Sequence, residues 1–281
     1  MTRYQFDYIT HINLTNRDIQ IADGLLTLRK YRLCLFLSWL FSSLAGASEQ
    51  ILVAVASNFS LPMQQIARNF EQQSRYTVQL AFASSGKFYA QIVNGAPYDV
   101  FLSADQTTPA ALINKQLALP SSQFTYALGA LALWSADPQK IAGNSAILPT
   151  NQFNKLALAN PKLAPYGRAA HEVLSKLQLN EATQSRWVQG ENIAQTYQFV
   201  ASGNADIGFV ALSQIMHQRQ LISGSAWIVP ADMYQPIRQD AVLLKRAAQH
   251  VGAQQLMKYL RGPEAGEIIR SFGYQLEHTQ P

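Results

Sequence analysis

The sequence predicts an α/β fold of two doubly wound lobes with a ligand cleft between them. From Ile51 onward, short apolar runs alternate with stretches of helical periodicity, a pattern typical of parallel βα units. The segments FTYALG (124–129) and PADMYQPIRQD (230–240) are interpreted as two crossings between the lobes, which makes the first lobe discontinuous. About 234 residues follow position 47, which is enough for a sizeable core.

The expected elements follow one another along the chain. Apolar runs predict strands over 51–55, 77–82, 99–104, 126–135, 155–160, 205–212 and 226–230. Helical spacing predicts helices after the first two strands and near 165–177, 181–187 and 193–202. The end of the chain, from residue 241, predicts one strand and two helices. We assign residues 48–126 plus 233–281 to lobe 1 and residues 127–232 to lobe 2.

Residues 1–47 predict an N-terminal extension followed by a signal peptide. Arg29, Lys30 and Arg32 precede an apolar run, and the small residues Ala45 and Ala47 suit cleavage near Ala47. The apolar run, residues 33–44, is shorter than the roughly 20 residues of a membrane span, although a retained anchor is the alternative. We assign no function to residues 1–28. A periplasmic location is therefore expected for the rest of the chain.

The composition of the exported body narrows the possible partners. Without residues 1–47, 17 Lys and Arg stand against 14 Asp and Glu, and these basic residues are not clustered. Nucleic acid is therefore not an expected partner, since it requires many phosphate contacts. Cys34, in the leader, is the one cysteine in the sequence, so that the exported body needs no disulfide.

Two polar loops follow the first two predicted strands. They are ASNFS (56–60) and ASSGK (83–87), and both lie at the carboxyl end of a strand and the start of a helix. A helix start offers unpaired N–H groups and a positive partial charge, which suit an oxyanion, and Gly86 permits close approach of the backbone. Ordinary helix capping by Ser and Asn is the alternative for either loop alone.

Several segments make the chain resemble a known family. The runs VASNF (55–59), ASSG (83–86), AQIVNGAPYDVFLSADQ (90–106), NPKLAPYGRAA (160–170) and GPEAGEIIRSFGY (262–274) look like those of periplasmic molybdate-binding proteins of ABC transporters. The likeness covers essentially all of the exported body. It implies a type II periplasmic binding protein, a hinge-closing receptor that holds one tetrahedral oxyanion between its lobes and delivers it to a membrane permease.

The resemblance also implies which residues bind the anion. The family's ligand positions match Ser57, Asn58 and Ser85 on one side of the cleft. They match Tyr166 and Ile193 on the other side, where the backbone N–H groups would be the donors. Many relatives have a tyrosine that reaches the anion after the IGFV strand. Ala211 or Leu212 occupies that place here, so we do not expect that contact.

The chemistry of the loops agrees with molybdate or tungstate as the ligand. Both ions are fully ionised near neutral pH and only accept hydrogen bonds, whereas monoprotonated phosphate would need an acceptor that neither loop provides. Sulfate, which is smaller, or another small oxyanion is the alternative. A secreted serine hydrolase is a remote alternative, because no G-x-S-x-G motif occurs in the exported sequence. The ranking of molybdate against tungstate stays open.

Other partners are expected to be absent. His171, His217 and His250 are widely spaced and follow no metal-ligand pattern, so no bare metal cation is expected. Asp105 is predicted to act as a cap or turn residue, because a carboxylate would repel an anion. Lys87 is predicted to lie on the surface. We further expect no enzyme activity, no cofactor, and a monomer.

Overall fold

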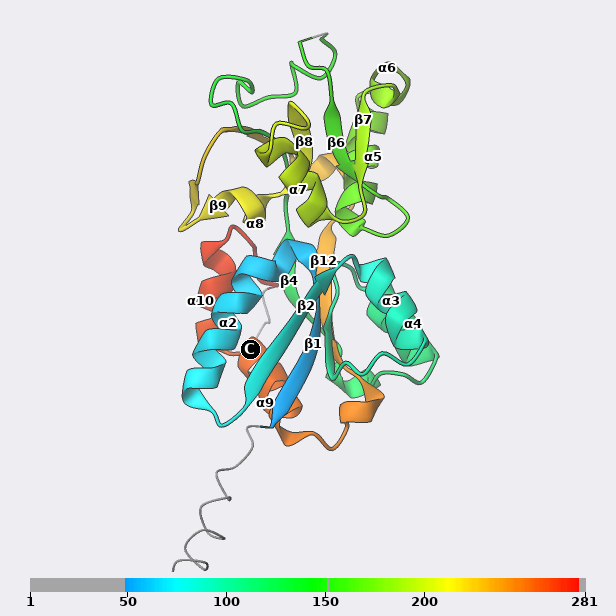
Figure 1. Ribbon diagram of the computed structural model, residues 1–281, viewed down its shortest axis with the longest axis vertical. Helices are drawn as coiled ribbons and strands as arrows, with labels where there is room; N and C mark the ends of the chain where they lie inside the picture. The colour runs from blue at the N-terminus through cyan, green and yellow to red at the C-terminus, as the bar shows by residue number, and fades with distance from the viewer. Residues whose placement is uncertain (1–48, 151, 278–281) are drawn as a thin grey trace, which may run out of the picture. The chain divides into compact units, whose positions relative to one another are not determined.

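The computed structural model describes residues 49–150 and 152–277, which form two mixed five-stranded sheets covered by helices (Figure 1). The first sheet with its helices is called lobe 1 below, and the second sheet with its helices lobe 2. The predicted N-terminal extension and signal peptide lie outside the described residues. Within the described part of the chain, none of the helices combines the length and the apolar character that a membrane crossing requires.

The sheet of lobe 1 contains strands from both ends of the described chain. Its order is β2 (Thr77–Ala83), β1 (Gln50–Ala56), β3 (Val100–Leu102), β12 (Ile237–Leu243) and β4 (Phe124–Gly129). β1 is parallel to β2 and β3, whereas β12 is antiparallel to both β3 and β4. The central strands are buried on both faces, as expected of a sheet covered on both sides.

Helices cover the two faces of this first sheet (Figure 1). One face carries α2 (Ser60–Gln73), α9 (Val251–Leu260) and α10 (Pro263–Ser271), and the other carries α3 (Ser85–Val93) and α4 (Thr107–Asn114). Side chains alternate between faces along a strand, so Val53 and Val55 pack in the first core while Ala54 packs in the second. The apolar residues at helical spacing after the first strand, Met63, Ile66, Ala67 and Phe70, form the buried face of α2.

The sheet of lobe 2 also has helices on both faces, and successive strand residues pack against different helices. Its order is β11 (Ser225–Ile228), β5 (Leu131–Ser135), β8 (Ile207–Ala211), β6 (Leu156–Ala159) and β7 (Trp187–Gly190). Leu133 packs with residues of α5 (Pro165–Lys176), and the next residue, Trp134, packs with residues of α7 (Ile193–Ala201). The short elements are η1 (Ser57–Phe59), η2 (Pro120–Ser122), α6 (Asn180–Gln184), α8 (Leu212–Ile215), β9 (Met216–His217), β10 (Gln220–Leu221), η3 (Ala231–Met233) and η4 (Lys245–Ala247).

Three local predictions differ from the structure. The apolar run 126–135 was expected to be one strand, but it is divided at Ala130 into β4 and β5, which belong to different sheets. The helix expected over 181–187 ends at Gln184, and Trp187 begins β7. Helix α4 was not predicted. Strand pairing in the folded protein determines where the run 126–135 is divided, because the apolar pattern alone does not show where the chain leaves one sheet for the other.

The two segments interpreted as crossings contain strands that lie side by side. β4 occupies 124–129, and β12 begins within 230–240 and pairs with β4 in antiparallel register. The register shifts opposite Gln239 and Asp240, because Tyr126 is an extra residue on β4 at this point, which makes a β-bulge in β4. The exact lobe boundaries, 126/127 and 232/233, stay predictions.

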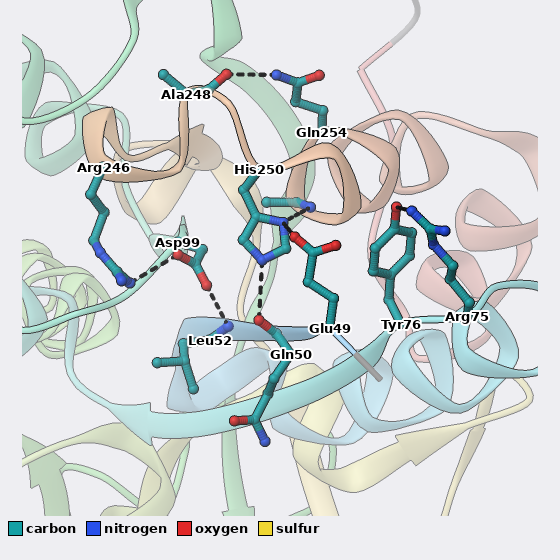
Figure 2. A network of polar contacts seen from close by, with 11 residues as sticks. Glu49, Gln50, Leu52, Arg75, Tyr76, Asp99, Arg246, Ala248, His250 and Gln254 are labelled. Carbon is teal, nitrogen blue, oxygen red and sulfur yellow. Dashed lines mark hydrogen bonds and ion pairs between the residues drawn. The ribbon is translucent and has the colours of Figure 1, made fainter. Parts of the chain in front are cut away.

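A polar network fixes the amino end of β1 (Figure 2). Asp99 accepts from the Leu52 N–H at 2.8 Å and pairs with Arg246 at 2.9 Å. The His250 ring lies 3.1 Å from the carbonyl oxygen of Gln50 and caps α9 by accepting from the Ala253 N–H. These contacts anchor the end of β1 that lies opposite the loop 56–60.

Candidate oxyanion site

All five residues predicted from the resemblance line one small cavity. The cavity measures about 10 Å³, close to the space that a single water requires. Its lining comes from the end of β1 and the loop after it, the start of α3, the loop after β3, and the starts of α5 and α7. The lining residues are Ala56, Ser57, Asn58, Ser84, Ser85, Ala104, Ala164, Pro165, Tyr166 and Ile193. In this arrangement the cavity has room for about one water molecule, so a tetrahedral ion can enter only if the lining residues of the two lobes move apart.

The serines of lobe 1 that line the cavity differ in their hydrogen bonds. The Ser85 hydroxyl accepts a hydrogen bond from the Ala104 N–H at 2.9 Å, which leaves its own proton free to donate. The Ser57 hydroxyl makes no hydrogen bond with any residue that the structure describes. Ser84 is the N-cap of α3 and accepts from the Lys87 N–H, so the capping alternative holds for the first serine of the pair.

Asn58 contributes to the cavity differently from the serines. Its side-chain Nδ2 donates to Gln239 Oε1 at 2.7 Å and to the Tyr274 hydroxyl at 2.9 Å. The backbone carbonyl oxygen of Asn58 accepts from the Ser213 hydroxyl at 2.8 Å. Because both amide hydrogens have partners, the backbone N–H is the donor that Asn58 can still offer.

Tyr166 and Ile193 bring helix starts of lobe 2 to the cavity. Pro165 and Tyr166 are the first two residues of α5, and Ile193 is the first residue of α7. The N-cap Asn192 accepts from the N–H groups of Ala194 and Gln195 and leaves that of Ile193 aside. Within the described residues, the N–H groups of Ser85, Tyr166 and Ile193 have no hydrogen-bond partner. Each helix start therefore presents a free donor and a positive partial charge.

The immediate surroundings of the cavity are neutral. None of the described residues that line it carries a charge. Burial raises the pKa of Tyr126 and Tyr166 well above the usual value for a phenol, and it raises the pKa of Tyr274 to about 12. These phenols stay protonated over the physiological range and keep negative charge away from the cavity.

Ion pairs join the lobes near the cavity. Lys87 on α3 pairs with Glu191 of the β7–α7 loop at 2.8 Å, and Arg168 on α5 pairs with Asp105 at 2.8 Å. The other oxygen of Asp105 accepts from the Thr108 N–H at 2.9 Å in the first turn of α4, which is the predicted capping role. The Lys87 side chain is 47% exposed, which agrees with the surface position expected for it.

Sequence reasoning did not identify Gln239, Tyr126 or Tyr274, which lie behind the lining residues. All three are buried, and they contact one another or Asn58 by hydrogen bonds. The polar pair Gln239 and Asp240 inside the apolar strand β12 was the available signal. A polar residue at a buried strand position requires partners.

The remaining predictions concern residues away from the cavity. Ala211 and Leu212 are buried and do not line it. His171 packs edge-on against Trp187, and His217 packs at a tilt against Phe272. His250 caps α9. Among the described residues, three or more His, Cys, Asp or Glu side chains are nowhere grouped in a way that could hold a metal ion.

Comparison with known proteins adds independent information. The family described as "Bacterial extracellular solute-binding protein" matches residues 51–275. The molybdate-binding protein ModA of Azotobacter vinelandii is 50% identical over 233 residues, which cover 83% of this chain and 92% of that protein. ModA of Rhodobacter capsulatus is 46% identical over 235 residues, covering 84% and 92%. A solved structure of the Azotobacter vinelandii periplasmic molybdate-binding protein has a TM-score of 0.79 at 44% identity, covering 81% of this chain and 99% of that one.

Proposed function

The chain belongs to the family of bacterial extracellular solute-binding proteins, and on that premise we propose that it captures molybdate or tungstate and delivers it to the permease of an ABC transporter. The observation that carries the proposal is the arrangement of donors. The hydroxyls of Ser57 and Ser85 and the N–H groups at the starts of α5 and α7 surround one cavity that no charged side chain of the described residues lines. The relatives named for molybdate support the choice of ligand.

In this proposal the anion is held by dipoles from both lobes. Lobe 1 supplies the serine hydroxyls and the N–H groups of Asn58 and Ser85, and lobe 2 supplies the N–H groups of Tyr166 and Ile193. Each charge-assisted bond contributes about 1.5–3 kcal/mol, and five or six of them offset the desolvation of a dianion to give micromolar to nanomolar affinity. Since the ligand contacts both lobes, binding stabilises the closed arrangement.

The site discriminates by charge and by size. A fully ionised tetrahedral ion accepts from every donor, whereas monoprotonated phosphate brings a proton that finds no carboxylate among the lining residues. The cavity has room for about one water, so the lobes part slightly to admit a tetrahedral ion, and a larger organic solute would require them to part further. Sulfate meets the donor pattern but is smaller, so its bonds to the opposite lobe are longer and weaker.

The receptor has a location and a membrane partner in this function. We propose that the receptor acts as a monomer in the periplasm, after cleavage of a signal peptide near Ala47. The two lobes in their closed arrangement form the surface that the membrane permease recognises. The site binds its ligand without chemical change, and the molybdenum or tungsten enters as an oxyanion rather than as a bare cation.

Competition calorimetry tests the ligand assignment. The purified protein is titrated with molybdate, tungstate, sulfate and phosphate separately, and then with molybdate in the presence of excess sulfate. We expect micromolar or tighter binding of molybdate and tungstate, and binding of sulfate and phosphate at least a hundredfold weaker. Tighter binding of sulfate than of molybdate would assign the receptor to sulfate, and absence of binding by all four anions would refute an oxyanion site.

A further inference from the structure

Gln239 joins the two lobes behind the candidate anion site. This residue lies on β12, the second crossing strand, and its side chain is fully buried. Its Oε1 accepts from Asn58 Nδ2 at 2.7 Å and from the Tyr126 hydroxyl at 3.0 Å, both in lobe 1. Its Nε2 donates to the hydroxyl of Tyr166 in lobe 2 at 3.1 Å. A single amide therefore holds cavity-lining residues from both lobes.

Tyr166 has two separate roles in this arrangement. Its backbone N–H is at the start of α5, beside the cavity, while its phenol extends to the crossing strands. The residue is 1% exposed. Moving its hydroxyl away from Gln239 would move the start of α5, and with it the donor groups of lobe 2.

Gly129 on the other crossing strand makes room for this contact. A Cβ atom at position 129 would overlap the Tyr166 hydroxyl and crowd the Gln239 amide. The β-bulge opposite Gln239 and Asp240 lies on the same strand, β4, where Tyr126 is the extra residue. The crossing strand β4 thus carries both a glycine and a bulge beside the hydrogen bond between Gln239 and Tyr166.

We propose that the Gln239–Tyr166 hydrogen bond is a latch that positions the donors of lobe 2 and couples lobe closure to anion binding. Gln239 is a positioning residue, since it acts through Asn58 and Tyr166 and does not line the cavity. The expected effect on the Kd for molybdate rests on the oxyanion-binding function proposed above. The closure of the lobes over each other can be measured without any ligand.

The Gly86 amide reports closure directly. Its N–H donates to the carbonyl oxygen of Leu163 at 3.0 Å, which is a backbone hydrogen bond between the lobes. When the lobes separate, this amide becomes open to solvent exchange. Hydrogen exchange at Gly86, measured by NMR on the ligand-free and the molybdate-loaded protein, therefore gives the population of the open arrangement.

The test uses Tyr166→Phe, which removes the hydroxyl and keeps the backbone donor. We expect exchange at Gly86 to accelerate at least threefold in the ligand-free protein, and the Kd for molybdate to rise about 3- to 30-fold. Tyr234→Phe is the control, because Tyr234 is also a buried tyrosine and its hydroxyl accepts from the Leu131 N–H instead of contacting Gln239. This control should leave both the exchange at Gly86 and the Kd within twofold of the unaltered protein.

A second variant tests whether the two residues act through one bond. Gln239→Met and Tyr166→Phe together should accelerate exchange at Gly86 by less than the product of their separate effects, because both changes remove the Gln239–Tyr166 bond, while Tyr166→Phe also removes the contact of this hydroxyl with Tyr274. Additive effects of the two changes, or unaltered exchange in Tyr166→Phe, would overturn the proposal. Urea unfolding of each variant shows whether a loss of global stability accounts for faster exchange.

The outcomes separate this proposal from the function on which it rests. If the unaltered protein binds none of the four oxyanions but Tyr166→Phe accelerates exchange at Gly86, the latch holds and the oxyanion function fails. If the unaltered protein binds molybdate and Tyr166→Phe changes neither exchange nor Kd, the function holds and the latch fails.

Discussion

The N–H of Gly86 on α3 donates to the carbonyl oxygen of Leu163 at 3.0 Å, and this bond connects the start of a lobe 1 helix to the loop before α5 in lobe 2. A Cβ atom at position 86 would lie 3.1 Å from Leu163 Cα and 3.2 Å from its carbonyl oxygen. The lobes can therefore approach this closely because residue 86 lacks a side chain.

Gly86→Ala is expected to hold the lobes apart and to weaken anion binding. Overpacking costs about 1–3 kcal/mol, which corresponds to a Kd for molybdate roughly 5 to 100 times higher. Isothermal titration measures the change. Gly266→Ala on α10 is the control, since its Cβ would meet the flexible side-chain ends of Leu276 and Arg270, both within lobe 1. Equal affinities of the Gly86→Ala variant and the unaltered protein would contradict this account.

The two serines are expected to differ in their effect on stability. Ser57→Ala and Ser85→Ala should each raise the Kd for molybdate about 10- to 100-fold, because each removes a charge-assisted donor. Ser85→Ala also leaves the Ala104 N–H without its acceptor, which should lower the free energy of unfolding by about 1–3 kcal/mol. Ser57→Ala removes no such partner. Titration and urea unfolding of both variants check the contrast, and equal stability losses would argue against it.

The ion pairs between the lobes are expected to matter little. Both side chains of Lys87–Glu191 are substantially exposed, and in Arg168–Asp105 the arginine is 45% exposed while Asp105 is 14% exposed. An ion pair with an exposed cation contributes about 1 kcal/mol or less. Lys87→Met and Arg168→Met should each raise the Kd by less than about fivefold. The effect of each change should shrink further in 0.5 M NaCl. A loss above twentyfold in either variant would mean that charge, rather than neutral donors, dominates binding.

Stability is expected to fall at alkaline pH because of the buried phenols. Burial raises the pKa of Tyr274 to about 12, whereas an unfolded tyrosine ionises near 10. Its contribution is therefore complete below pH 10 and is lost as the pH rises from 10 toward 12. One such group changes the free energy of unfolding by up to about 1.4 kcal/mol per pH unit. Urea unfolding between pH 9 and pH 11 should show a shallower decline in Tyr274→Phe, and identical slopes would refute this role.

Local chemistry in the sequence indicated two loops of the lobe 1 side of the candidate site, and the resemblance to a known family supplied the individual residues. Parallel strands end at one edge of a sheet, so the polar loops 56–60 and 83–87 were expected to converge, and Ser57 and Ser85 line the same cavity. The positions in lobe 2 came from the resemblance to a known family, because Tyr166 and Ile193 act through backbone groups. A backbone donor leaves little trace in the identity of its residue.

The sequence by itself determined the α/β class, the order of most strands and helices, and the loops rich in donors, because these depend on periodicity and on residue chemistry close in the chain. Only the tertiary structure decided that 124–135 divides between two sheets, that the Asn58 side chain is occupied, and that Gln239 links Asn58 to Tyr166. Residues 58, 166 and 239 lie far apart in sequence. Their contact depends on how the two crossing strands bring the lobes together. No pattern of neighbouring residues in the sequence encodes that arrangement.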